Sequence, residues 1–155
     1  MEIRFSVSGR ISRPVSEVFE AVVNPERLSR FFTTGGATGR IQPGAVVEWD
    51  FHDFPGAFPV YIDEVEEDRR IVLRWDASNG AAQPDANGAA RTTVVMTFKP
   101  LGDGRTLVEI SEYGWLETQE GLGASYDNCE GWTGMLCAMK MWLEHGINLR
   151  DGFYK

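Results

Sequence analysis

The chain has 155 residues and carries 15 Lys and Arg against 23 Asp and Glu, a net charge of −8 at pH 7. An acidic surface repels phosphate backbones and anionic lipids, so nucleic acid and membrane surfaces are excluded as expected partners. Hydrophobic residues make up 43% of the chain and charged residues 25%. These proportions predict a single globular domain over residues 1–155 and exclude disordered or fibrous classes.

No segment has the composition of a membrane-spanning helix or of an export signal. The most apolar region, Cys129 to Leu143, is interrupted by Glu130 and Lys140, whereas a spanning helix needs about 20 apolar residues. The first residues, 1–4, lack the apolar core of a signal peptide. We therefore expect a cytoplasmic protein.

The two cysteines, Cys129 and Cys137, are separated by about 12 Å if both lie on one helix. That distance is too long for a disulfide. We expect both to be reduced and buried among apolar residues.

The first third of the chain predicts one strand and two short helices. Residues 2–12 alternate apolar and polar side chains, as in a half-buried strand. Apolar residues then recur at helical spacing up to about Val23, and Asn24-Pro25 has the composition of a second helix start. The apolar face of this second helix comprises Leu28, Phe31 and Phe32.

From Gly35 to Gly114, turn residues separate short β-rich runs, which is typical of an antiparallel meander. Gly102-Asp103-Gly104 contains an Asp-Gly pair and predicts a hairpin. Residues 77–90 are small and polar, so we expect an exposed loop there. The strands are expected at residues 39–41, 46–52, 58–66, 70–76, 91–99 and 106–114.

The last element is a long amphipathic helix, expected from Ala124 to His145 and ended by Gly146. Its sheet partner must bury an apolar face against it, which gives an α+β domain. The apolar stripe of the helix comprises Cys129, Trp132, Met135, Leu136, Met139, Trp142 and Leu143.

Several segments, in this order, resemble one superfamily over nearly the whole chain. They are Ile11 to Phe19, Asn24 to Leu28, Phe31-Phe32, Arg70 to Trp75, Ser111 to Trp115 and Gly131-Trp132. The chain resembles the START-like, helix-grip superfamily, also called SRPBCC. Within it, the chain is most similar to the branch that resembles the C-terminal domain of activators of heat-shock-protein ATPase.

The resemblance implies a curved antiparallel sheet of about seven strands wrapped around a long C-terminal helix, with two short helices after the first strand and an internal pocket. It implies less about activity, because similar proteins include binders of lipids and other hydrophobic metabolites, cyclases, dehydratases, quinone-associated proteins and co-chaperones. The chain has no room for the separate chaperone-binding domain of the eukaryotic activators, so we do not expect a chaperone partner. A homodimer is left open.

The residues give little sign of metal or nucleotide chemistry. His52 and His145 lack cysteine or carboxylate neighbours at metal-ligand spacing, and Gly35 to Gly39 lacks the lysine of a phosphate-binding loop. We therefore expect no metal and no cofactor. His52 lies beside Asp53 and could act as a general base if the two side chains meet, but neighbours on a strand point to opposite faces.

A pocket between the sheet and the long helix is expected to have an aromatic wall. Its entrance is expected between two mobile segments, residues 77–90 and 116–123. The predicted ligand-binding residues are Trp49, Phe51, Trp75, Met96, Glu112, Trp132, Leu136 and Met139.

Glu112 is the residue most suited to chemistry. The side chains of Val108 and Ile110 must face the interior, and the two-residue period of a strand places Glu112 on the same side. Burial would raise its pKa and make it an acid or a hydrogen-bond donor. It could instead pair with an arginine or reach solvent at the end of the strand.

The sequence thus favours a binding protein that holds an apolar or aromatic metabolite, such as a lipid, a quinone or a polyketide-like compound. The first alternative is an enzyme of the cyclase or dehydratase type, in which Glu112, with His52, would be catalytic. The second is a co-chaperone-like interaction protein. Binding is preferred because no nucleophile, metal or acid–base pair is assembled in the sequence.

Overall fold

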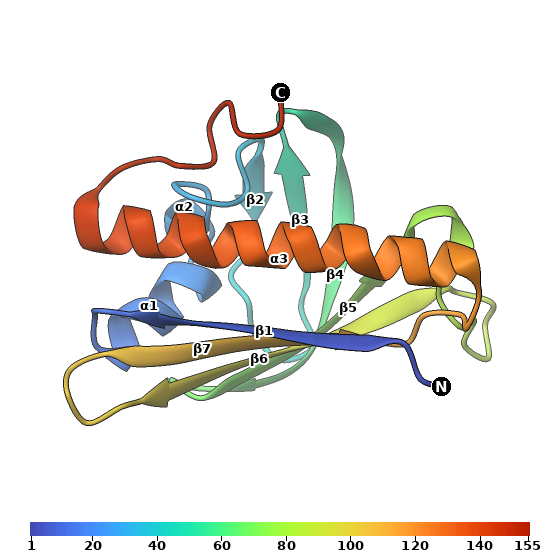
Figure 1. The fold of residues 1–155 in the computed structure, drawn as a ribbon, viewed down its shortest axis with the longest axis horizontal. Helices are drawn as coiled ribbons and strands as arrows, with labels where there is room; N and C mark the ends of the chain where they lie inside the picture. Colours follow the sequence, from blue (N-terminus) through green and yellow to red (C-terminus); the bar gives the residue numbers. More distant parts are fainter.

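The computed structural model describes all residues from Met1 to Lys155. Strands and helices follow one another in the predicted order, with a single sheet and a long last helix (Figure 1). The elements are β1 (Arg4–Ile11), α1 (Val15–Val23), α2 (Pro25–Leu28), β2 (Gly36–Thr38), β3 (Val46–Phe51), β4 (Phe54–Glu66), β5 (Arg70–Asp76), the short 3₁₀ helix η1 (Ser78–Gly80), β6 (Arg91–Pro100), β7 (Thr106–Tyr113) and α3 (Gln119–His145).

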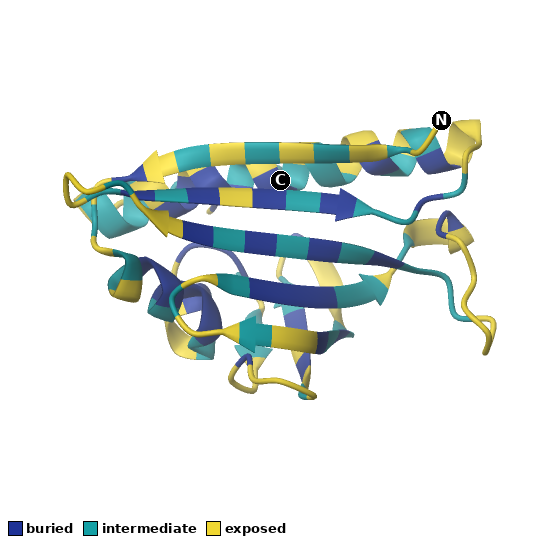
Figure 2. Cartoon of the chain, turned by 90° about the horizontal axis from the view of Figure 1, so that it is seen from below, coloured by how far each residue is buried: buried dark blue, intermediate teal, exposed yellow.

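The sheet has seven antiparallel strands in the order β1-β7-β6-β5-β4-β3-β2. Only β1 departs from a simple meander, because it pairs with the last strand. Along β1, β7 and β6 in Figure 2, more buried residues alternate with less buried ones, so one face of these strands is covered more than the other. In β7 this alternation places Val108, Ile110 and Glu112 on the covered face. The α+β helix-grip architecture is therefore confirmed.

Two predicted elements near the N-terminus have different bounds. Helix α2 begins as expected, with Asn24 Oδ1 accepting hydrogen bonds from the N–H groups of Glu26 (3.0 Å) and Arg27 (3.4 Å), but it ends at Leu28. Phe31 and Phe32 are buried in the turn that follows. The apolar spacing was therefore correct about burial and wrong about the length of the helix.

The strand predicted at residues 39–41 is also misplaced, since β2 lies at Gly36–Thr38. Gly39 has a φ of +95°, which ends the strand, and its position is crowded by Val47 Cγ1, 3.2 Å from where a Cβ would lie. Ile41 instead donates its N–H to the carbonyl of Val23 and joins the core.

The hairpin between β3 and β4 is tighter than the sequence indicated. Phe51 pairs with Phe54, so only His52 and Asp53 form the turn, and β4 begins four residues earlier than Phe58. Pro55 and Gly56 are residue types that favour turns, and the predicted strands leave them in the connection. They lie instead at the start of β4, which is exposed there.

Helix α3 is longer than predicted at its start and ends where expected. Thr118 Oγ1 accepts the N–H of Gly121 at 3.1 Å and caps a helix that begins at Gln119, so most of residues 116–123 is helical rather than loop. Gly146 has a φ of +67° and closes the other end. The loop at residues 77–90 is not exposed throughout as predicted, because Ala81 and Ala82 are buried and Ala82 forms a bridge with Trp115.

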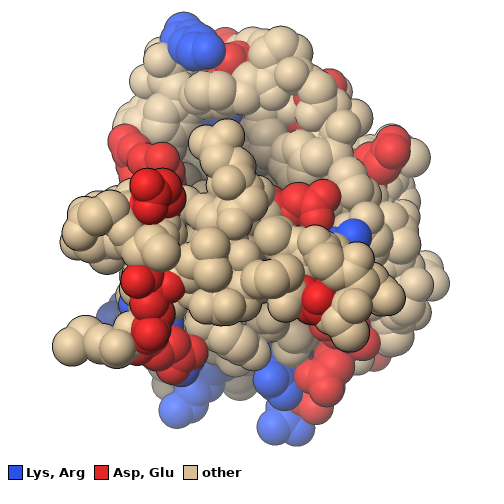
Figure 3. All heavy atoms as spheres, turned by 90° about the vertical axis from the view of Figure 1, so that its right-hand side faces the viewer, with Lys and Arg blue, Asp and Glu red and all other residues tan.

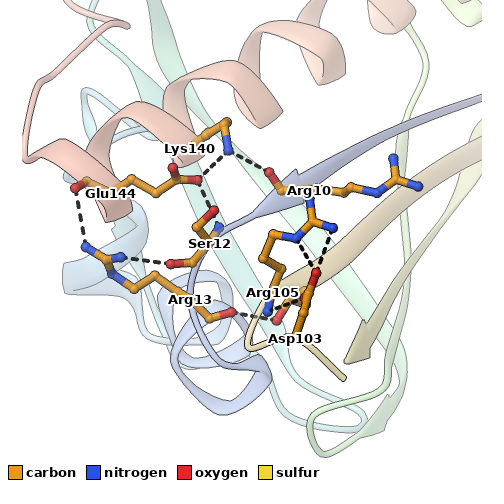
Figure 4. Close-up of polar contacts among 8 residues, drawn as sticks. Arg10, Ser12, Arg13, Asp103, Arg105, Lys140 and Glu144 are labelled. Carbon is orange, nitrogen blue, oxygen red and sulfur yellow. Dashed lines mark hydrogen bonds and ion pairs between the residues drawn. The ribbon is translucent and has the colours of Figure 1, made fainter. Parts of the chain in front are cut away.

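The end of α3 is attached to β1 by polar contacts (Figure 4). The carboxylate of Glu144 accepts the N–H of Ser12 at 2.9 Å and the ammonium of Lys140 at 2.6 Å, and Lys140 also donates to the carbonyl of Arg10 at 2.9 Å. Arg13 donates to the carbonyl of Glu144 at 3.3 Å. The helix packs closely on β1 along its length and is therefore further from β3, β4 and β5, on the opposite side of the curved sheet.

Candidate functional site

A cavity of about 1120 Å³ lies between α3, the ends of β3, β4 and β5, and the C-terminal segment, residues 147–155. This is at the upper end of the size of small-molecule sites. The aromatic part of its lining comprises Phe32, Phe51, Phe54, Phe58, Trp75, Tyr126, Trp132, Phe153 and Tyr154.

Trp132 is the centre of the aromatic wall. It projects from α3, and its ring centroid lies 5.5 Å from Phe32 and 5.3 Å from Trp75, with interplanar angles of 26° and 31°. Phe51 and Phe58 stack beside them at 6.1 Å. Such pairs add to the stability that area burial supplies. They also present flat apolar surfaces to whatever occupies the cavity.

Glu112 lies directly behind this wall and is fully buried. The indole N–H of Trp75 donates to Oε2 at 2.9 Å, and the indole N–H of Trp132 donates to Oε1 at 2.9 Å. Thr92 Oγ1 is 2.5 Å from Oε2. Asn128 Nδ2 donates to both oxygens, at 2.9 and 3.2 Å. The carboxyl group thus accepts hydrogen bonds from three residues of the cavity wall, Trp75, Asn128 and Trp132, and fixes their positions.

Burial raises the pKa of the Glu112 carboxyl, and the hydrogen bonds from Thr92, Trp75, Trp132 and Asn128 oppose that effect in part. No cation lies among its hydrogen-bond partners. The arginine partner considered from the sequence is therefore absent. Both carboxyl oxygens are occupied by protein donors, so Glu112 acts on the cavity through its neighbours.

Asp53 does not pair with His52, the arrangement considered from the sequence. Its carboxylate instead accepts two hydrogen bonds from the Arg150 guanidinium, at 2.5 and 2.9 Å, and both side chains are almost wholly buried. This hydrogen-bonded arginine lowers the pKa of Asp53. His52 is half-exposed, with its Nε2 3.8 Å from a carboxylate oxygen of Asp151.

The Asp53–Arg150 pair holds the C-terminal segment over the cavity. The guanidinium also lies 4.7 Å from the ring centroid of Tyr154 and 5.5 Å from that of Phe51. Burial and the nearby carboxylate of Glu130 raise the pKa of Tyr154. The sequence analysis missed this segment, although its apolar and aromatic residues in a short tail were a signal: Leu149, Phe153 and Tyr154 all line the cavity.

The structure divides the predicted ligand-binding residues into three groups. Phe51, Trp75 and Trp132 line the cavity, and Glu112 is behind them. The others are packed in the main core cluster and do not reach the cavity surface: Trp49, Met96, Leu136 and Met139. They remain predictions as ligand contacts.

The helix explains this division. The stripe that includes Leu136 and Met139 faces the sheet, and the cavity borders the adjacent face of α3, where small residues lie. The two cysteines are on this side, and Cys137 is exposed rather than buried as predicted, while Cys129 is half-buried. The cavity-facing small residues are Cys129, Gly131, Gly134 and Cys137.

The structure offers neither a metal site nor a membrane-spanning helix. No group of three or more His, Cys, Asp or Glu side chains is close enough to hold a metal ion. No helix combines the length and apolar character that crossing a bilayer requires.

Comparison with known proteins identifies the family. A sequence profile described as Activator of Hsp90 ATPase homolog 1-like protein matches residues 12–144. The chain belongs to this family. A search of curated protein sequences found no match.

Solved structures of related fold include a protein from Staphylococcus saprophyticus, SSP2350, with a TM-score of 0.77, 22% identity and 96% of each chain covered. The Aha1 protein of Colwellia psychrerythraea, described as a dimer, has a TM-score of 0.73 and 14% identity over 93% of this chain and 98% of its own. DynU16, from the dynemicin biosynthetic locus, has a TM-score of 0.74 and 24% identity over 92% of this chain and 48% of its own. At these identities, the solved structures show only that the fold is shared.

Proposed function

We propose that this member of the family binds an apolar or aromatic small molecule in the cavity between α3 and the sheet. The single observation that carries the proposal is a large cavity walled by aromatic side chains, with the polar groups behind that wall already satisfied. Sites of this kind take ligands that are mostly apolar. The structural similarity to DynU16, a protein from a biosynthetic locus, supports a metabolite as the ligand.

The arrangement of Glu112 favours binding over the cyclase or dehydratase alternative. An acid or base must come within hydrogen-bond reach of the atom that it protonates or deprotonates. Trp75, Asn128 and Trp132 stand between Glu112 and the cavity and use both of its oxygens. His52, the other candidate, is absent from the cavity lining. Reaction chemistry would require a rearrangement of the wall, whereas binding requires none.

The proposal is tested by filling the cavity from the helix. A Cβ built at Gly131 meets no atom within 4 Å, and Gly131 lines the cavity. A tryptophan there should occupy space that a ligand would use, without crowding the core. We expect Gly131→Trp to abolish the fluorescence enhancement of N-phenyl-1-naphthylamine, an uncharged apolar probe, that the wild-type protein gives.

Gly123→Trp is the matched control. Gly123 is on the same helix, is exposed, has the same open space around its Cβ position and lies outside the cavity. Both variants should gain only about 0.3–0.5 kcal/mol in helix propensity, because tryptophan is a better helix former than glycine but a poorer one than alanine. The control should bind the probe with wild-type affinity. If Gly131→Trp also binds it with wild-type affinity, the cavity is not the binding site and the proposal is wrong.

A homodimer stays a prediction for this chain. The Colwellia psychrerythraea relative is a dimer, and Val46, Phe54, Ile147 and Phe153 are large apolar side chains that this chain exposes. Light scattering coupled to gel filtration measures the mass directly. A mass equal to one chain at concentrations of about 100 μM would contradict a stable dimer.

A further inference from the structure

We propose that the cavity selects aromatic ligands that carry a hydrogen-bond donor, such as a phenolic hydroxyl or an amine, and disfavours anionic ligands. This inference rests on the proposed function, because it names the chemical class that the same cavity binds. Among the compounds considered from the sequence, it favours hydroxylated aromatic ones over fatty acids and over quinones, which lack a donor.

The first observation is the orientation of Asn128. This residue lines the cavity, and its Nδ2 donates to both oxygens of the buried Glu112. A carboxylate only accepts hydrogen bonds, so it fixes which end of the Asn128 amide faces it. If Glu112 is protonated, the short contact with Thr92 Oγ1 is the place for the proton, and the amide keeps the same orientation.

The consequence is an unused acceptor at the cavity. Asn128 Oδ1 has no hydrogen-bond partner in the protein and is not enclosed by it. Asn128 and Trp75 share the Glu112 carboxyl, so this acceptor lies near the partly buried ring of Trp75, which is the aromatic platform here, while Trp132 supports that ring and is itself only 1% exposed. A ligand ring stacked on that platform can donate an O–H or N–H to Oδ1, whereas a ligand carbonyl or ether oxygen there would face another acceptor.

The second observation concerns cations. Arg150 is the only lysine or arginine in the lining, and its guanidinium is already bound on two sides by the Asp53 carboxylate. A ligand carboxylate or phosphate would therefore meet no cation in the lining other than this paired one, because Lys155 lies outside it, over the ring of Phe54. Arg150 is only 6% exposed, so the N–H groups that Asp53 leaves free are poorly accessible, and displacing Asp53 would break a buried pair, which is strongly unfavourable.

The third observation is the charge at the cavity mouth. Asp127 and Glu130 line it from α3, are exposed, and have no basic partner, while Asp76 on the opposite side is paired with Arg91 at 3.0 Å. In Figure 3, acidic side chains flank the uncharged centre of the face on which α3 begins, and most basic ones are near its upper and lower edges. This charge repels anions and attracts cations, with a strength that salt reduces.

The test uses four naphthalene probes of similar size and the wild-type protein. They are 2-naphthol, a donor; 2-methoxynaphthalene, which has no donor; 2-naphthylmethylamine, a cation with donors; and 2-naphthoate, an anion. Dissociation constants come from quenching of tryptophan fluorescence. We expect 2-naphthol and the amine to bind about threefold to tenfold more tightly than 2-methoxynaphthalene, and 2-naphthoate to bind most weakly.

Two variants assign the effect to residues. In Asn128→Ala, the ratio of the dissociation constant of 2-methoxynaphthalene to that of 2-naphthol should fall to about one, the readout being this ratio and not either affinity alone. In Glu130→Gln, binding of the amine should weaken and binding of 2-naphthoate should improve at low salt, while the preference for 2-naphthol remains. If Asn128→Ala does not fold, the order of the four probes in the wild-type protein still decides the inference.

The outcomes separate this inference from the proposed function. If no probe binds the wild-type protein, the proposed function fails and the inference fails with it. If the probes bind but 2-methoxynaphthalene equals 2-naphthol, or 2-naphthoate binds most tightly, the inference is overturned and the proposed function stands. An equal loss of affinity for all probes in Asn128→Ala would also overturn it, because Asn128 would then act only by supporting the wall.

Discussion

At the scale of single residues, Glu112 differs from an ordinary buried carboxyl because each of its two oxygens accepts a hydrogen bond from a different indole N–H. Trp75 donates to Oε2 and Trp132 to Oε1. A carboxyl group can serve both donors whether or not it is protonated, since each oxygen keeps a lone pair. An amide cannot, because its nitrogen only donates. Glutamate is therefore required here by hydrogen-bond geometry.

Glu112→Gln should destabilise the protein by about 1–3 kcal/mol, since one buried indole N–H would face the amide nitrogen and lose its acceptor. Urea unfolding at about pH 5, close to the ordinary pKa of glutamate, measures this difference in stability. Glu109→Gln is the control, because Glu109 is on the same strand with its side chain in solvent. Equal stability of the two variants would show that the indole contacts contribute nothing.

The titration of Glu112 gives a second prediction. Its pKa is raised in the folded protein above the ordinary value of 4.5, so between these two pKa values the folded state holds more protons than the unfolded state. The free energy of unfolding then falls as pH rises. The stability difference between the wild type and Glu112→Gln should be largest below pH 4.5 and shrink above it. Because other carboxyls are common to both proteins, a pH-independent difference would contradict the raised pKa.

At the scale of elements, the start of α3 depends on a glycine that the sequence pattern did not single out. A Cβ at Gly121 would lie 1.9 Å from the carbonyl oxygen of Leu116, which is backbone and cannot move aside. This close approach allows the chain to turn from Trp115 into the helix that Thr118 caps. The helix start could not be found from apolar spacing, since Gln119 to Gly123 carries only Leu122 as a large apolar residue.

Gly121→Ala should therefore destabilise the protein by about 1–3 kcal/mol, the usual cost of forcing extra atoms into a packed site. Gly123→Ala, two residues further along, has open space at its Cβ and should stabilise it by about 0.5–1 kcal/mol. Thermal unfolding of the two variants measures the contrast. A rise in melting temperature for both would mean that the contact with Leu116 relaxes at no cost.

The elements themselves were largely predictable because they depend on local patterns. The limits of β5 and the end of α3 agree with the periodicity and with Gly146. The errors came from turns: alternation alone did not show that Asp53 sits in a two-residue hairpin, or that Gly39 would end β2. Backbone conformation at such positions depends on contacts with residues far away in the chain.

At the scale of the whole molecule, the cavity wall combines segments that only the fold brings together. Arg150 and Asp53 are 97 positions apart, and Trp75 and Glu112 are 37 apart. Strand parity predicted that Glu112 faces inward, but parity does not identify the donors that surround it. The C-terminal segment has no periodicity, so its apolar and aromatic residues indicated burial but not the surface on which they pack.

The same assembly decided which apolar residues meet the cavity. Leu136 and Met139 belong to the apolar stripe of α3 and are buried against the sheet. The cavity borders the neighbouring face of α3, which carries Gly131 and Cys137. An amphipathic pattern shows which side of a helix is buried, but it does not distinguish burial against a sheet from burial beneath a ligand. That distinction depends on the curvature of the sheet and the distance at which β1 holds the helix.

The close packing of Trp75 and Trp132, with ring centroids 5.3 Å apart, gives the protein an optical property. Two indoles at that separation share their electronic transitions, so the pair contributes a coupled signal to the near-ultraviolet circular dichroism. Both rings are held by one carboxyl group and both face the same cavity. A ligand bound against this pair changes the surroundings of the indoles, so we expect the near-ultraviolet signal to report occupancy of the cavity.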